Sequence, residues 1–452
     1  MLEFAVVLLA LILLMLVAYR GLSVILFAPL CALLAVLLSL GPAAVLPCFS
    51  HIFMVKMVSF IQLYFPVFLL GAVFGKCVEL SGSAASIAAF IVGLLGERRV
   101  MLAIVLACAL LTYGGVSLFV VAFATYPLAA NLFQRANIPK RLIPGTIALG
   151  AFTFTMDALP GTPQIQNVIP TTVFKTDLYA APLLGCCGAL FVLIGGMLYL
   201  ERQRRAAADE GYGFSEEANQ VEARLPFALA MLPLVVVAGV NLLLLPRLRA
   251  AYGATFDFAT LGLPEDGQIE VAKVVGIWSI EIALSCGILT CLALRPRGVT
   301  EGLRAAVAGA LLAAMNTGSE YGFGGVIASL PGFKALKGFL ANSFADPLVN
   351  EAVSVNLLAG ITGSASGGLS LALAALGQQY LDSGLPPEVL HRVASMASGG
   401  MDTLPHNGAV ITLLLITGLT HRDSYKDIFV ITCLKTAAVF VAIGLYRATG
   451  LY

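Results

Sequence analysis

Apolar runs long enough to cross a membrane recur along most of the chain. A helix that crosses the roughly 30 Å hydrocarbon core of a bilayer needs about 20 mostly apolar residues. Runs that fit this requirement predict membrane-spanning helices at 2–19, 22–40, 57–75, 178–200, 225–246, 274–294 and 428–446.

Two uncharged stretches, 100–134 and 352–381, are longer than one span needs and are interrupted by glycine and hydroxyl residues. The interruptions, at 113–117 and 360–368, free backbone groups that must face protein or a water-filled cavity in lipid. Each is either a tight turn between two spans or an unwound point within one. We therefore expect an all-α polytopic membrane protein of roughly 12 to 14 transmembrane and re-entrant segments.

Composition supports a membrane protein and excludes other classes. Hydrophobic residues make up 59% of the 452 residues and charged residues 11%, whereas about 25% charged residues is typical of soluble domains. The 26 Lys and Arg nearly balance the 25 Asp and Glu, so no basic surface is expected to recruit nucleic acid. The nine cysteines form no Cys-x-x-Cys pair, and we expect neither a metal site nor a cofactor beyond a coupling ion.

A charged segment, 201–224, separates two apolar halves, 1–200 and 225–452. Its arginines directly follow a predicted span, so the positive-inside rule places this linker in the cytoplasm. Short motifs recur in the same order in both halves, which indicates a duplication of the kind that marks binding sites in transporters. The matches are Phe74-Gly75 with Phe323-Gly324, 115–118 with 368–371, and 156–160 with 401–405.

The last of these matches breaks the apolar pattern with a carboxylate, proline and small residues. The arms around the first copy, 142–156 and 165–174, are short for full spans, which favours a re-entrant hairpin or a broken helix. A helix broken at mid-depth exposes N–H groups that hold an anion without Arg or Lys nearby, and carbonyls that hold a cation. The alternative is a surface loop in which Asp157 and Asp402 cap helices.

Asp157 and Asp402 are the ionisable groups that this interpretation places within the membrane, where such residues are functional candidates. Burial favours the neutral form of a carboxyl group, which suits a group that loads and releases a proton. The alternative is a carboxylate that accepts backbone N–H bonds and never titrates. His406, in the second break, is either a substrate donor or proton carrier, or a structural histidine.

A polar stretch at 316–325 closes an uncharged run that begins at 305. Its amide, hydroxyls and glycines, including Asn316 and Gly324, suit a small polar ligand. Glu320 is either a proton-coupling group or a residue at the membrane interface.

The segments 156–167 and 400–411 resemble those of the gluconate permease (GntP) family, within the ion transporter superfamily. The resemblance covers nearly the whole chain. It implies an inner-membrane secondary transporter that takes up small hydroxy-carboxylates, typically with protons. It also implies two inverted repeats with hairpins and broken helices, and a homodimer with an elevator-like motion. At 159–164 the chain lacks the histidine-containing tip of gluconate transporters, and 401–408 is closer to relatives assigned to 3-hydroxybutyrate.

The leading hypothesis is a proton-coupled symporter of a small organic monocarboxylate, with Asp157, Asp402 and Glu320 as candidate proton carriers. Sodium coupling is the alternative, since carbonyl-built cation sites leave little trace in sequence. We disfavour a membrane-embedded enzyme because we find no convergent nucleophile and base, and a passive channel does not need two matched breaks. The substrate-binding candidates are Gly115, Ser117, Thr162, Gln164, Asn316, Gly324, Ser364, Ser370, Thr403, His406 and Asn407.

Overall fold

The computed structural model describes residues 2–20, 22–96, 99–116, 118–207, 209–213, 225–262, 267–294, 296, 298–333, 344–362, 364–405 and 407–452. Each predicted span coincides with a helix, because a continuous apolar run in lipid satisfies its backbone only by coiling. These helices are α1 (Leu2–Tyr19), α2 (Val24–Leu40), α4 (Met54–Leu80), α11 (Pro182–Ala206), α12 (Phe227–Tyr252), α13 (Val271–Ala293) and α20 (His421–Thr449).

Five helices among the described residues are long and apolar enough to cross a membrane. They are α11, α12, α20, most of α13, and the continuous stretch Pro42–Leu80, which joins η1 (Pro42–Ala44), α3 (Val45–Cys48), η2 (Phe49–Phe53) and α4. Shorter apolar helices include α5 (Ser83–Leu95), and α14 (Val299–Ser329) packs along α4. The fold is therefore an all-α membrane architecture, as expected.

The two glycine-containing interruptions separate the arms of two helical hairpins. The first hairpin consists of α6 (Val100–Tyr113) and α7 (Leu118–Arg135), and the second of α16 (Pro347–Thr362) and α17 (Ala365–Leu381). In the first, the Cys108 thiol donates to Thr125 Oγ1 over 3.4 Å. In the second, Tyr380 Oη donates to Asn350 Oδ1 over 3.2 Å. Because these partners lie far from each turn, the two arms of each hairpin run side by side and antiparallel.

The Asp-x-Leu-Pro segments, in contrast, interrupt helices that continue past the break. The first comprises α8 (Leu142–Ala151), α9 (Phe154–Asp157) and α10 (Ile165–Phe174), and the second α18 (Pro387–Ser398) and α19 (Gly408–Thr417). The α8 and α10 arms have different neighbours: α8 packs on α6 and α20, and α10 on α17 and α18. Of the two forms expected from the sequence, the broken helix is the one that these segments adopt.

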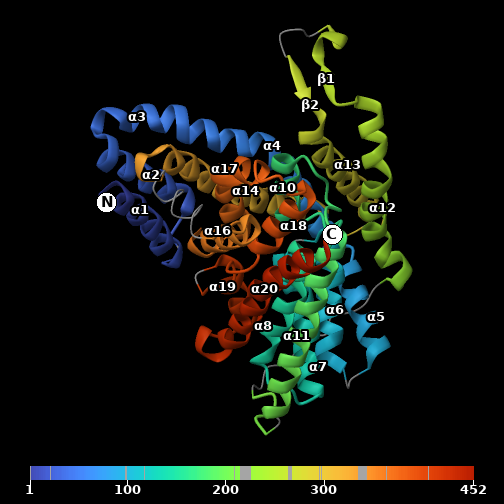
Figure 1. The fold of residues 1–452 in the computed structure, drawn as a ribbon. Coiled ribbons are helices and arrows are strands. Elements are labelled where there is room, and N and C mark those ends of the chain that lie inside the picture. The colour runs from blue at the N-terminus through green and yellow to red at the C-terminus, as the bar shows by residue number, and fades with distance from the viewer. Residues whose placement is uncertain are drawn as a thin grey trace.

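The two ends of the molecule can be told apart by their connections (Figure 1). At the linker end, α11 stops, α12 starts, and Leu225 N–H donates to Ser86 Oγ over 3.0 Å. At the ribbon end, β1 (Thr255–Asp257), η4 (Phe258–Leu261) and β2 (Gln268–Glu270) join α12 to α13, with Phe256 opposite Ile269 in an antiparallel pair. The ribbon projects at the top of Figure 1, and α7 and α11 reach the bottom.

The two halves of the sequence pack into one body. Helix α4 packs on α14, α11 packs on α20, and one hydrophobic cluster contains buried side chains from both halves. Helix α11 continues to Ala206, so 201–206 of the predicted linker is helical, while 214–224 lies outside the described residues. The α6–α7 turn points away from the linker end and the α16–α17 turn away from the ribbon end. The inverted relation of the halves itself stays a prediction.

Candidate functional site

A cavity of about 800 Å³ lies where the two hairpin turns and the two broken helices meet. Four helices begin at its wall: α7 at Leu118, α10 at Ile165, α17 at Ala365 and α19 at Gly408. The first turn of a helix presents N–H groups without intrahelical partners and the positive end of the helix dipole. Four helix starts therefore border the same cavity.

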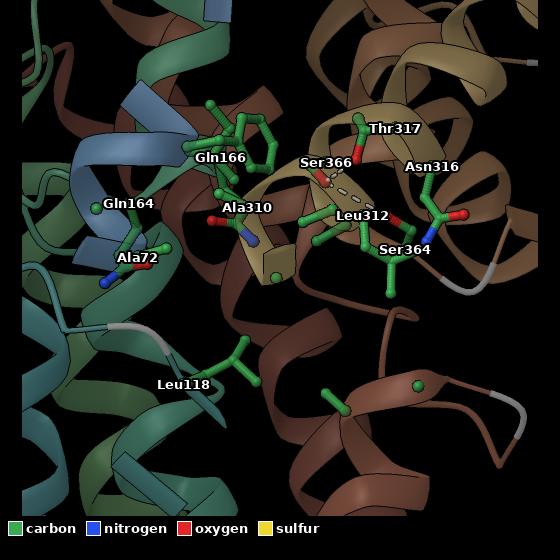
Figure 2. A pocket seen from close by; sticks show the side chains of 18 of the residues that line it. Ala72, Leu118, Gln164, Gln166, Ala310, Leu312, Asn316, Thr317, Ser364 and Ser366 are labelled. Carbon is green, nitrogen blue, oxygen red and sulfur yellow. Dashed lines mark hydrogen bonds between the residues drawn. The ribbon is translucent and has the colours of Figure 1, made fainter. Parts of the chain in front are cut away.

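Polar side chains gather at one part of this cavity, on α14 and at the start of α17 (Figure 2). Ser364 Oγ accepts the N–H of Gly367 over 3.1 Å and so caps α17. Thr317 Oγ1 lies 3.4 Å from Ser366 Oγ, which joins α14 to this cap. Asn316 lines the cavity beside them. Hydroxyl and amide groups so placed suit a ligand with several oxygens.

Glu320 is the carboxyl group of this polar region. Its side chain is 4% exposed and lines the cavity. Its Oε2 lies against the Cα of Gly367, where any larger residue would collide with it, and has no hydrogen-bond partner among the described residues. The acid is thus held at the start of α17, at the place where a bound anion would lie.

The starts of α10 and α19 are fixed by amide side chains. Gln164 Nε2 donates to Thr112 O over 2.8 Å and to Val116 O over 3.2 Å, which ties the start of α10 to the α6–α7 turn. Asn407 Oδ1 accepts the N–H groups of Ala409, over 2.6 Å, and Val410, over 3.2 Å. Both side chains line the cavity, so they hold the helix starts and border the ligand space at once.

An ion pair at the broken helices was missed by the sequence analysis. Lys435 Nζ lies 2.8 Å from Asp402 Oδ1, with the side chains 3% and 6% exposed. The same ammonium donates to Phe152 O over 2.8 Å, at the gap between α8 and α9. Lys435 therefore joins α20 to both breaks. The expectation of an anion site with no Arg or Lys nearby is wrong on this point, and a lysine inside the apolar run 428–446 was the available signal.

A second buried cation, Arg392, ties the two halves together behind the cavity. Its guanidinium donates to Ala180 O over 2.7 Å, Leu178 O over 3.2 Å and Asn167 Oδ1 over 3.0 Å. The neighbouring His391 lies 3.0 Å from Asn167 Oδ1 through Nε2. Because these donors are used on carbonyl and amide oxygens, Arg392 holds α18 against the segment that follows α10 and does not line the cavity.

The structure brings most of the candidate residues to one cavity. Those that line it are Gly115, Gln164, Asn316, Glu320, Ser364, Asp402, Thr403 and Asn407. The others fall outside its lining or outside the described residues. Asp157, Thr162 and Ser370 are buried elsewhere, and Gly324 serves as close packing against Leu371. Ser117 and His406 lie outside the described residues.

The cavity extends from the helix starts toward the linker end. Its wall passes along α14 at Ala310 and Ala305 and reaches Lys76 and Glu79, near the end of α4. These two side chains are half-buried and form an ion pair of 2.7 Å. Between the polar region and this pair the wall is largely apolar, with Val67, Phe68 and Leu284 among its residues. The site thus has a polar inner end and an apolar passage.

Polar groups at helix breaks that border a cavity in an all-α membrane fold are typical of membrane transporters, and the chain was compared with known proteins. The chain resembles the crystal structure of the Alcanivorax borkumensis YdaH transporter, which is described as having an unusual topology. The TM-score is 0.58, the two sequences are 17% identical, and 90% of each chain is covered. That likeness concerns the fold. No protein-family model matches the chain.

The relationship in sequence is much closer to a Bacillus protein. The chain is 60% identical to the uncharacterized transporter YxjC of Bacillus subtilis (strain 168), over 99% of this chain and 100% of that protein. It therefore belongs to the same family of membrane transporters.

Proposed function

We propose that the protein is a proton-coupled symporter that takes up a small organic hydroxy-monocarboxylate, such as gluconate or 3-hydroxybutyrate, through the cell membrane. The observation that carries this proposal is the meeting of four helix starts at one cavity. The resemblance of the two Asp-x-Leu-Pro segments to gluconate permeases gives the class of substrate. It also suggests that the protein acts as a homodimer.

The helix starts favour an anion of limited size. Each helix N-terminus stabilises a nearby negative charge by about 0.3–1 kcal/mol, and by up to about 2 kcal/mol where it is partly buried. Four such ends supply several kcal/mol without a free cation, since Lys435 is already paired with Asp402. Gln164, Asn316 and Thr403 line the cavity with amide and hydroxyl groups, which supports a substrate that carries hydroxyl groups.

Glu320 is the proton carrier that the geometry favours. Two unit charges 4 Å apart repel each other by about 4 kcal/mol at an effective dielectric constant of about 20. An ionised Glu320 therefore opposes an anion in the same cavity, and a proton on Glu320 removes this repulsion. Asp402 differs because its charge is compensated by Lys435, and Asp157 lies behind the wall of the cavity. Proton and anion then bind together, which is the condition for symport.

The arrangement of charges supports an inward-facing state. If the arginine-rich linker lies in the cytoplasm, the cavity extends to the cytoplasmic side by way of Lys76 and Glu79. Sodium coupling is the second candidate, because exposed carbonyls at helix breaks also suit a cation. A membrane-embedded enzyme has less support, since no nucleophile and base converge among the described residues of the cavity.

Uptake by the purified protein in proteoliposomes tests the proposal. With labelled 3-hydroxybutyrate and gluconate as probes, an inwardly directed proton gradient should drive accumulation, and a sodium gradient at fixed pH should not. Glu320→Gln should retain exchange of the labelled probe but lose accumulation. Accumulation driven by sodium alone, or a Glu320→Gln variant that accumulates the probe like the wild type, would contradict the proton-coupled mechanism.

A further inference from the structure

A second buried carboxyl group lies outside the substrate cavity. Glu351, in the first turns of α16, is fully buried, and neither of its carboxyl oxygens has a hydrogen-bond partner among the described residues. Ser354, three residues further along α16, is buried as well. Burying an ionised carboxylate without a donor or cation is strongly unfavourable, so this environment accepts Glu351 only with its proton.

A small cavity reaches the same region from the ribbon end. It has a volume of about 200 Å³ and is lined by Asn350 and Tyr380, together with the exposed Asp382 and Ser383 at the end of α17. Asn350 directly precedes Glu351 on α16. Asn350 and Tyr380 are joined by a hydrogen bond of 3.2 Å, so the cavity wall beside this part of α16 is polar.

The charged and titratable groups on the elements packed against α16 do not compensate Glu351. Some of these groups have other partners, namely Arg392, Lys435, His391 and Arg447. Glu388 is partly exposed. Glu3 of α1 is exposed as well. Arg447 of α20 is held by Asp346, at the start of α16, over 2.7 Å. Among the described residues, Glu351 therefore has no hydrogen-bonded partner for its carboxyl group, and the small cavity lies near it on α16.

We propose that Glu351 is a second proton-binding site, reached by water from the ribbon end through the cavity at Asn350 and Tyr380. This inference rests on the proposed function, because it supplies the outer site from which a coupled proton enters. The α16–α17 hairpin carries Glu351 near its open end, and at its turn Gly367 contacts Glu320 in the substrate cavity. One structural unit therefore contacts Glu320 near its turn and carries Glu351 toward its other end.

Infrared spectroscopy of the purified protein in lipid tests the site directly, with pH and deuterium oxide as the only probes. The wild type should show the carbonyl band of a protonated carboxylic acid that shifts in deuterium oxide. Glu351→Gln should lose one component of this band and keep the component from Glu320, and Glu351→Asp should shift the component from Glu351. The matched control, Glu388→Gln, removes a partly exposed carboxyl on α18 and should leave the band in place. An unchanged band in Glu351→Gln would overturn the proposal.

Transport separates this site from the proposed function. If the wild type accumulates labelled 3-hydroxybutyrate under a proton gradient, Glu351→Gln should lose accumulation and keep exchange at equal pH on both sides. Normal accumulation by this variant would contradict a role of Glu351 in coupling. If the wild type accumulates no probe under a proton gradient, the symport proposal fails, and the infrared band alone then decides whether Glu351 binds a proton. Should Glu351→Gln fail to fold, Tyr380→Phe must shift the band, and an unshifted band would contradict the site.

Discussion

Removing the ammonium of Lys435 should destabilise the fold far more than removing both members of its ion pair. Lys435 and Asp402 lie 2.8 Å apart with side chains 3% and 6% exposed, and Lys435 also donates to Phe152 O. Deleting one partner of a buried pair leaves an uncompensated charge and costs about 3–5 kcal/mol. We therefore expect Lys435→Met to lower the free energy of unfolding by about that amount.

The double variant Lys435→Met/Asp402→Asn carries no uncompensated charge. Its main loss is the hydrogen bond from Lys435 to Phe152 O. A buried carbonyl group left without a partner costs about 1–3 kcal/mol. The double variant should therefore be more stable than Lys435→Met alone, with a coupling energy of about 2 kcal/mol or more between the two sites.

Equilibrium unfolding of the four proteins in mixed detergent micelles measures this coupling energy. The control is the pair Arg447 and Asp346, whose geometry is similar, at 2.7 Å, but whose side chains are 41% and 32% exposed. An exposed pair contributes about 0–1 kcal/mol, so its coupling energy should be smaller. If the effects of Lys435→Met and Asp402→Asn are additive within about 0.5 kcal/mol, the two residues do not form the pair described.

Two further predictions concern the cavity. Gly367→Ala places a Cβ against Glu320 Oε2, and the resulting strain of about 1–3 kcal/mol should reduce uptake by about tenfold or more. The control variant Gly239→Ala, whose Cβ meets open space in α12, should transport like the wild type. Equal uptake by the two variants would contradict the contact between Gly367 and Glu320. In a chain without native cysteines, Ala313→Cys on the wall of the larger cavity should react with an impermeant maleimide added from the linker end. Asp382→Cys at the smaller cavity should react from the ribbon end. Labelling of both cysteines from the same side would refute the orientation of the larger cavity.

The spans of this fold could be predicted from sequence because lipid leaves the chain little choice. An uncharged run of about 20 residues satisfies its backbone in a bilayer only as a helix, and the helices α1, α2 and α20 lie where the apolar runs lie. The path of the chain at each break could not be predicted in the same way. Glycine and proline show that a helix stops, but the contacts of the two arms decide whether it turns back, as after Tyr113, or continues, as after Asp157.

The candidate site was predictable only in part for a related reason. Polar residues at the breaks, such as Gln164 and Asn407, mark the cavity because polar side chains in an apolar run gather where helices stop. The surroundings of these residues depend on elements distant in sequence. Asp402 pairs with Lys435 of α20, and Gly324, which a repeated motif singled out, packs closely against Leu371. Glu351 gave no motif at all, and its isolation became visible only when its neighbours were in place.

The position of a bound anion tests the central claim most directly. A cryo-electron microscopy structure of the protein in lipid nanodiscs, with saturating 3-hydroxybutyrate or gluconate at acidic pH, should show the ligand carboxylate at the starts of α10, α17 and α19. Its density should lie within hydrogen-bonding reach of the first N–H groups of these helices and beside Glu320. Ligand density elsewhere in the protein, with these helix starts facing only water, would contradict the account.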